Sequence, residues 1–154
     1  MSWITPKTDW KIEFDGSGEY LADFFNVDDY NRIKNNLLYL RDLAEELFKT
    51  MPPIVVGADK HLPISASPDF DNDNIFADEI NAIEDGLDSI EKEIDLFDHG
   101  HKQTFYDNGR FIGYEELNRI ESAQLELYNF ITDSIAGKQK LAIRLGMREN
   151  DLRV

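Results

Sequence analysis

Residues with the chemistry to bind a metal ion lie in two short clusters. In the first, residues 69–74, oxygen-bearing side chains alternate as they do at the beginning of a calcium-binding loop. A complete loop of this kind has glycine at its sixth position and glutamate at its twelfth, whereas this chain has Asn74 and Ile80 there. We therefore expect a solvated segment that precedes a helix rather than a dedicated calcium site.

The second cluster is Asp98-His99-Gly100-His101, with His61 as a distant third imidazole. Two histidines that flank a glycine just after a helix more often form a plain C-terminal turn, which Gly100 would terminate. The chain has no cysteine, which excludes thiolate ligands and disulfide bonds. We predict that the protein needs no metal and no cofactor.

Three pairs of adjacent carboxylates are the remaining candidates for acid and base chemistry. They are Asp28-Asp29, Asp78-Glu79 and Glu115-Glu116. Each pair begins an amphipathic pattern, where the positive end of a helix dipole and its unpaired amides stabilise acidic side chains. The chain has no glycine-rich phosphate loop and no serine or cysteine nucleophile motif. We therefore predict that this protein is not an enzyme.

The three acidic pairs belong to one repeated motif. Residues 25–37, 75–87 and 112–124 align without gaps as FNVDDYNRIKNNL, IFADEINAIEDGL and IGYEELNRIESAQ. The positions that recur after each acidic pair are the asparagines Asn31, Asn81 and Asn118 and the isoleucines Ile33, Ile83 and Ile120. The copies are 50 and 37 residues apart, so the motif is a reused helix start rather than a strict solenoid repeat.

The repeated asparagine is the unusual member of the motif, because asparagine is a mediocre helix former. One interpretation is structural: the amide binds the chain that leads into the helix, or a neighbouring helix, and so fixes the register. The other interpretation is a repeated contact with a ligand. We favour the structural interpretation, because polar residues beside apolar seams usually specify geometry.

Apolar residues follow each copy of the motif at alternating spacings of three and four. This pattern predicts three amphipathic helices near residues 27–50, 76–98 and 114–136. Asn26 is the expected N-cap of the first helix, and the cap of the second is expected further upstream, among residues 71–74. We predict a mainly α protein, a three-helix bundle whose narrow apolar stripes pack within one chain.

Two β-hairpins are predicted before the first and third helices. Asp15-Gly16-Ser17-Gly18 and Asp107-Asn108-Gly109 are turn sequences between short apolar runs. Residues 51–74 contain four of the five prolines and predict a long loop. The predicted organisation is an N-terminal arm and hairpin (1–24), the three-helix bundle (25–137) with its hairpin near 104–112, and a basic C-terminal tail (138–154).

The net charge of −15 opposes binding to nucleic acid or to an anionic membrane. No apolar run approaches the length of a membrane span, and the first ten residues lack a signal-peptide pattern. Acidic residues concentrate in residues 78–98 and basic residues in 138–154. These two regions either meet, within one chain or between copies, or form a solvated acidic face and a loose tail.

The basic tail alternates apolar residues with other types. Leu141, Ile143 and Leu145 recur with a period of two, which predicts a strand that adds to a partner's sheet. A short amphipathic helix is the alternative.

Two tryptophans, Trp3 and Trp10, lie outside the predicted helices. Pro6 keeps this segment from being helical. Aromatic side chains in such a place either close one end of a core or anchor in a partner's pocket. For Trp10 the two alternatives are equal, and for Trp3 we favour the partner, because terminal residues are usually disordered unless they are tied down.

The opening Trp3-Ile4-Thr5-Pro6-Lys7-Thr8-Asp9-Trp10 and the later run Asp29-Tyr30-Asn31-Arg32-Ile33 carry a family resemblance. They resemble small structural proteins encoded in the tail regions of phages and prophages of Gram-positive bacteria, over about the first 90 residues. The resemblance implies a virion component of the tail tip, baseplate or host-adhesion apparatus, with no catalytic residues. We expect such a protein to assemble in the host cytoplasm, in several copies, with other tail or baseplate proteins as partners.

A second hypothesis rests on charge alone. The carboxylates of residues 78–98 would stand in for DNA phosphates, and the protein would inhibit a host nucleic-acid-binding protein. In either case the partners are proteins rather than nucleic acid or a membrane.

Overall fold

The computed structural model describes residues 2–11, 16–18, 25–48, 51–61, 74–94, 100, 102–106 and 112–145, with side chains up to Leu141. It contains helix α1 (Val27–Glu45), helix α3 (Ala77–Ile94) and helix α4 (Tyr114–Leu145). The predicted mainly α fold of three packed helices is confirmed. The described residues contain no strand, and most residues of the two predicted hairpins lie outside them, so both hairpins stay predictions.

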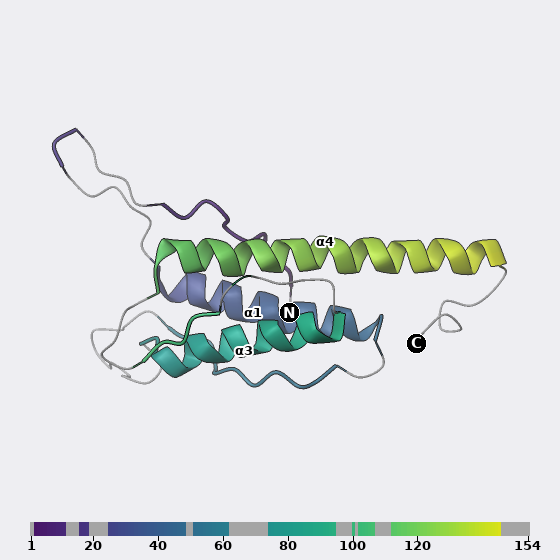
Figure 1. Cartoon of the computed structure of the whole chain (residues 1–154), viewed down its shortest axis with the longest axis horizontal. Coiled ribbons are helices and arrows are strands. Elements are labelled where there is room, and N and C mark those ends of the chain that lie inside the picture. The colour runs from purple at the N-terminus through teal and green to yellow at the C-terminus, as the bar shows by residue number, and fades with distance from the viewer. Residues whose placement is uncertain are drawn as a thin grey trace.

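All three helices run in the same direction, with their N-termini at one end of the bundle (Figure 1). The contacts between helices agree, because Arg32 near the start of α1 pairs with Glu121 near the start of α4. Arg119 of α4 pairs in the same way with Glu84 of α3. A parallel bundle requires the chain to return to the same end before each new helix. Two such return paths are needed, into α3 and into α4, and a similar segment precedes α1. The described parts are the first segment (2–11) before α1, the second segment (51–61) before α3 and the third segment (102–106) before α4. None of them is helical, and we call all three the return segments.

Helix α1 begins with the expected capping box. The Asn26 side chain accepts hydrogen bonds from the backbone N–H groups of Asp28 and Asp29, and Asp29 accepts one from the Asn26 N–H. Helix α3 begins at the equivalent position, Ala77, so the expectation of a cap further upstream is wrong. The reason is that Glu79 binds the Phe76 N–H at 2.9 Å and so supplies half of the capping box without a polar residue at the cap.

Helix α4 is longer than predicted and extends to Leu145, nine residues past the expected end at 136. The predicted strand is therefore wrong for residues 141–145, which are helical. Lysine, glutamine and leucine, which dominate residues 138–141, are good helix formers, and this local propensity outweighs the alternating pattern. Ile143 and Leu145 belong to α4 by their backbone, and their side chains lie outside the described part.

The helices contribute five layers to the core, and each layer takes one residue at the same position of the motif from each helix. The layers are Tyr30, Ile80 and Leu117; Ile33, Ile83 and Ile120; Leu37, Leu87 and Gln124; Leu40, Ile90 and Leu127; and Ala44, Ile94 and Ile131. All fifteen side chains are buried. Trp10, Met51, Phe105, Ile112 and Ala123 complete the core cluster. The register of the repeated motif is thus also the register of the core.

Gly86 of α3 has a packing reason for its place inside a helix. A Cβ atom on Gly86 would lie 2.8 Å from methyl groups of Ile54 and Leu37. The missing side chain therefore lets the second segment lie directly against α3. At Gly137 of α4, by contrast, a Cβ atom would meet nothing within 4 Å.

We expect Gly86→Ala to lower the free energy of unfolding, although alanine is the better helix former. Overpacking a filled core costs about 1–3 kcal/mol, and two contacts as short as 2.8 Å place the cost of Gly86→Ala above the gain of about 1 kcal/mol in helix propensity. Gly137→Ala is the matched control and should raise stability by up to about 1 kcal/mol. Urea unfolding followed by circular dichroism measures both changes, and equal effects at the two sites would contradict the packing role of Gly86.

Candidate functional site

Each repeated asparagine binds the backbone of one residue in a return segment through two hydrogen bonds. In every case the side-chain Nδ2 donates to a carbonyl oxygen and the Oδ1 accepts from the N–H of the same residue. The pairs are Asn31 with Lys60 (2.8 and 2.8 Å), Asn81 with Phe105 (2.8 and 2.8 Å), and Asn118 with Trp10 (2.8 and 2.7 Å). We call this arrangement the asparagine clasp. The amides bind protein backbone, as the structural interpretation predicts.

The three clasps form a closed cycle around the bundle. Asn31 of α1 holds the segment that leads to α3, and Asn81 of α3 holds the segment that leads to α4. Asn118 of α4 holds the segment that leads to α1 and so closes the cycle. Each return segment is therefore fixed to a helix other than the one that it enters.

A sequence signal for the clasped residues exists and was missed. The repeat between the first two copies extends upstream at the same spacing of 50 residues. Residues 1–10 (MSWITPKTDW) align with residues 51–60 (MPPIVVGADK), with Met, Ile and Asp identical at three positions. In this alignment Trp10 and Lys60, the two clasped residues, are equivalent.

The carboxylate of Glu121 lies at the centre of the contact between α1, α4 and the first segment. Its side chain is fully buried. Its Oε2 accepts hydrogen bonds from Trp10 Nε1 at 2.6 Å and from the Lys7 N–H at 3.1 Å. Its Oε1 accepts from Arg32 Nε at 2.9 Å and Nη2 at 2.7 Å. Burial raises the pKa of Glu121, against the lowering effect of these donors.

The first segment is held at its other end by a fourth asparagine. Asn36 of α1 accepts from the Ile4 N–H at 3.1 Å and donates to the Ile4 carbonyl at 2.7 Å. Next to it, Trp3 stacks on Tyr128 with ring centroids 4.2 Å apart and planes 6° apart, and Tyr39 lies 5.9 Å away. Trp3 therefore packs against aromatic side chains of its own chain while it stays half-buried, and its binding to a partner stays a prediction.

Trp10, the second tryptophan, is buried where the first segment lies along α1 and α4, which we call the groove of the first segment. Its ring packs edge-on against Phe25 at 6.2 Å, and the Arg32 guanidinium lies 5.9 Å from the ring centroid. With its backbone clasped by Asn118 and its indole N–H bound to Glu121, Trp10 closes one end of the core.

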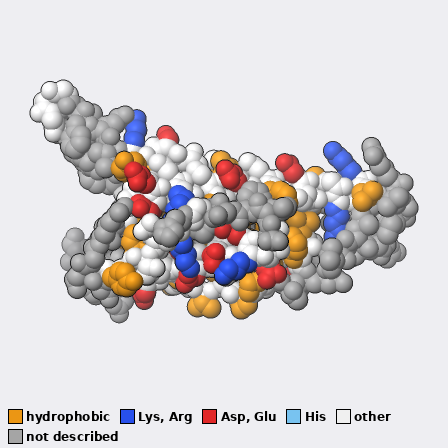
Figure 2. Space-filling model, in the orientation of Figure 1, with side chains coloured by type: hydrophobic (Ala, Val, Ile, Leu, Met, Phe, Trp, Pro, Cys, Tyr) orange, Lys and Arg blue, Asp and Glu red, His pale blue; other side chains and the backbone are white. Residues whose placement is uncertain are grey.

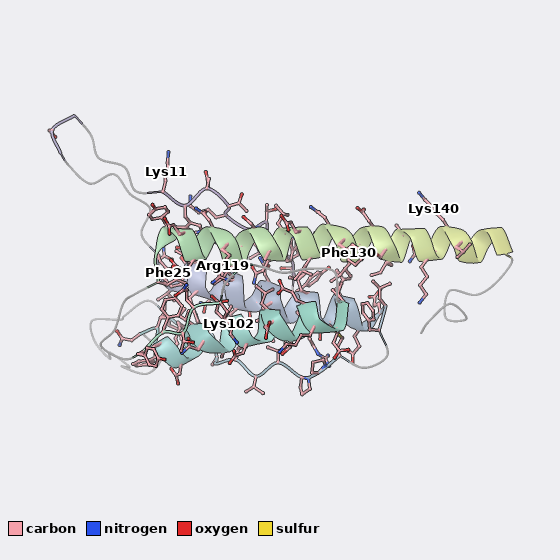
Figure 3. The ribbon with its side chains drawn as sticks, viewed as in Figure 1. Lys11, Phe25, Lys102, Arg119, Phe130 and Lys140 are labelled. Carbon is pink, nitrogen blue, oxygen red and sulfur yellow. The ribbon has the colours of Figure 1, made fainter. Side chains whose placement is uncertain are left out.

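Three residues after each clasp asparagine, each helix carries a buried ionisable side chain. These side chains are Lys34, Glu84 and Glu121. Arg119, labelled in Figure 3, donates from α4 to Glu84 of α3, with an Nη1–Oε2 distance of 3.1 Å. Lys34 instead pairs with Asp59 of the second segment and holds the pKa of that carboxyl below its ordinary value. Arg32 and Arg119 directly follow the clasp asparagines of α1 and α4, whereas α3 has Ala82 at the equivalent position. A glutamate in place of Lys34 would therefore have no arginine of α3 as its partner.

The acidic stretch of residues 78–98 does not form one exposed face in its described part. Glu84 and Glu91 are buried. Asp85 pairs with Lys102 at 2.7 Å, and Asp88 pairs with Lys92 at 3.0 Å.

Within the described part of the chain, no group of three histidine or acidic side chains is arranged to hold a metal ion. Residues 69–73, Asp98, His99 and His101 lie outside that part, so the expected absence of a calcium site and of imidazole ligands stays a prediction. None of the described helices is both long enough and apolar enough to cross a membrane. Chemically, the described arrangement binds extended polypeptide through side-chain amides and one buried carboxylate.

We expect Asn118→Ala to lower the free energy of unfolding by about 1–3 kcal/mol, because the Trp10 backbone loses both partners in a partly buried place. Asn129→Ala changes an exposed asparagine of the same helix and should alter stability by less than about 0.5 kcal/mol. Chemical denaturation measures both values. Equal small effects would show that the clasp does not hold the first segment.

We expect the unfolding free energy of the unchanged protein, relative to Glu121→Gln, to decrease as the pH rises from acid. The raised pKa means that the folded state binds the Glu121 proton more tightly than the unfolded state does. The stability from this proton is complete below the ordinary glutamate pKa and is lost as the pH rises through the folded-state pKa. Glu126→Gln, at an exposed position of α4, is the control. If Glu121→Gln left the pH profile of urea unfolding unchanged, the raised pKa would be contradicted.

Comparison with protein-family models, with characterised proteins and with solved structures finds no match to this chain. The resemblance to phage tail-region proteins therefore rests on the residues quoted for it. Any function assigned to the clasped bundle is accordingly a proposal.

Proposed function

We propose that this protein is a non-enzymatic structural or adaptor component of a phage virion, in the tail tip, baseplate or host-adhesion apparatus. The observation that carries the proposal is where the resembling residues lie. Trp3, Ile4, Lys7 and Trp10 of the opening run all contact α1 or α4, and Arg32 of the second run binds the same Glu121 as Trp10 does. The resemblance thus falls on the residues that build one groove of the bundle.

The way in which the chain is interlocked supports a structural role. Each return segment is continuous with the helix that follows it and is hydrogen-bonded to a different helix. A force on one segment is therefore distributed over two helices. The first segment is held at Ile4, Lys7 and Trp10, which anchors the N-terminal end of the described chain along the groove. A virion part that must keep its shape while it contacts neighbours would benefit from such an arrangement.

The alternative, a DNA-mimicking inhibitor, has less support. Such a mimic presents a continuous row of exposed carboxylates, as the phosphates of DNA are presented. In the described part of residues 78–98, Glu84 and Glu91 are buried, and Asp85 and Asp88 are paired with lysines. This charge arrangement is better explained as part of the packing and as ordinary surface charge.

We expect peptides of this protein in purified particles of the phage that encodes it. Mass spectrometry of gradient-purified virions, washed at high salt, should detect them in a constant ratio to the major tail protein. A phage-encoded enzyme of DNA replication, absent from the particles, is the control for carry-over. If the peptides occur only in the soluble fraction of the lysate, and the protein binds a host nuclease or polymerase in a salt-sensitive way, the inhibitor hypothesis replaces this one.

A further inference from the structure

Helix α4 continues well past the ends of α1 and α3 (Figure 1). The last layer of the core is formed by Ala44, Ile94 and Ile131, and no described residue beyond Ile131 in α4 is buried. Residues 132–145, which we call the overhang, extend for about 21 Å at the usual helical rise. Ile135, in the first turn of the overhang, still packs against the core, and the described parts of α1 and α3 end at Glu45 and Ile94, level with the start of the overhang.

The overhang is basic and partly apolar, unlike the rest of the molecule. Residues 132–145 contain the basic residues Lys138, Lys140 and Arg144 and only one acidic residue, Asp133. The whole chain, by contrast, has a net charge of −15. Leu141 is 48 % exposed, and Ile135 is only partly buried. Figure 2 shows basic and hydrophobic side chains next to each other at this end of the molecule.

The complementary surface lies on α3 and the second segment of the same chain. There, Pro53, Ile54 and Val55 line one side of a surface depression of about 280 Å³, and Asp85 lies on the other side. Val55 is 85 % exposed, which is unusual for a valine. Asp88 adds a second carboxylate one turn further along α3. Their lysine partners do not prevent exchange, because exposed ion pairs contribute little stability.

These two surfaces cannot meet within one molecule. Asp85 lies four residues after the clasp asparagine of α3, whereas Lys140 lies 22 residues after that of α4. Because the helices are parallel and in register, this difference corresponds to about 27 Å along the bundle axis. Figure 3 shows the separation, with Lys140 on the overhang and Lys102, the partner of Asp85, beside the bundle. A continuous helix holds the basic end away from its own acidic surface.

We propose that the overhang of one copy docks on the α3 surface of a second copy, with Leu141 in the depression beside Val55 and with Lys138 and Lys140 against Asp85 and Asp88. The contact joins two different surfaces, so it repeats from copy to copy and produces a ring or a filament. It rests on the proposed function in that it supplies the contact by which several copies of a tail component would associate. Surface charges of this kind set the partner and the orientation.

Sedimentation velocity of the full chain tests the proposal through a reversal of charge on each side. The unchanged protein should sediment faster as its concentration rises, and less so at high salt, because salt screens surface charges. Lys138→Glu/Lys140→Glu and Asp85→Lys/Asp88→Lys should each lose this association, as should Leu141→Asp. An equimolar mixture of the two charge-reversed proteins should regain it, because both of its possible contacts are again complementary.

The matched control is Asp9→Lys/Glu126→Lys, which makes the same change of net charge as Asp85→Lys/Asp88→Lys at exposed positions away from α3. It should associate as the unchanged protein does. Circular dichroism confirms that each variant keeps its helical content. The proposal is overturned if the unchanged protein sediments as a monomer at every concentration or if the charge-reversed variants still associate. A mixture that stays monomeric also overturns it and points to a different acidic protein as the partner.

The outcome is independent of the virion experiment. Association with the expected charge dependence, together with absence from virions, would remove the phage role and keep the contact between copies. Presence in virions together with a monomeric protein would remove only the contact.

Discussion

The buried carboxylate of Glu121 is the interaction on which the arrangement of the bundle depends. A charge out of water costs several kcal/mol unless it is paired and fully hydrogen-bonded. Glu121 meets this requirement only when the Arg32 guanidinium, the Trp10 indole N–H and the Lys7 N–H all reach it. Three parts of the chain must therefore be in place together. The apolar stripes of the three helices are nearly interchangeable, so the polar groups decide which segment lies in which groove.

The asparagine clasps solve a problem that a parallel bundle creates. Antiparallel helices can be joined by short loops, whereas parallel helices need return segments that run the length of the bundle. Such segments carry backbone groups that need partners wherever water is excluded. One asparagine amide satisfies both the N–H and the C=O of a single residue, and it does so at Trp10, Lys60 and Phe105. A leucine at the same place would offer neither bond.

The sequence was enough to predict the three helices, the capping box at Asn26 and the structural role of the repeated asparagine, because each follows from local chemistry and periodicity. Helix direction could not be predicted, since an apolar period of three and four reads alike in both directions. The partners of Glu121 could not be predicted either, because periodicity describes only neighbours along one helix. Arg32 is 89 residues away from Glu121 in the sequence, and Trp10 is 111 residues away. The alignment of residues 1–10 with 51–60 was the one available signal for the clasped segments.

Beyond the layer of Ala44, Ile94 and Ile131, packing in the core does not account for the continuation of α4. An isolated helix of fewer than about 12–15 residues is marginal in water, and the overhang has about that length. It is continuous with a well-packed helix, which removes the cost of nucleation, yet Leu141 near its end is half-exposed. The two charged surfaces that would complement each other are kept apart by the same helix. The core layers bury α4 as far as Ile131. A contact with a second copy would bury the apolar side chains of the overhang in the same way.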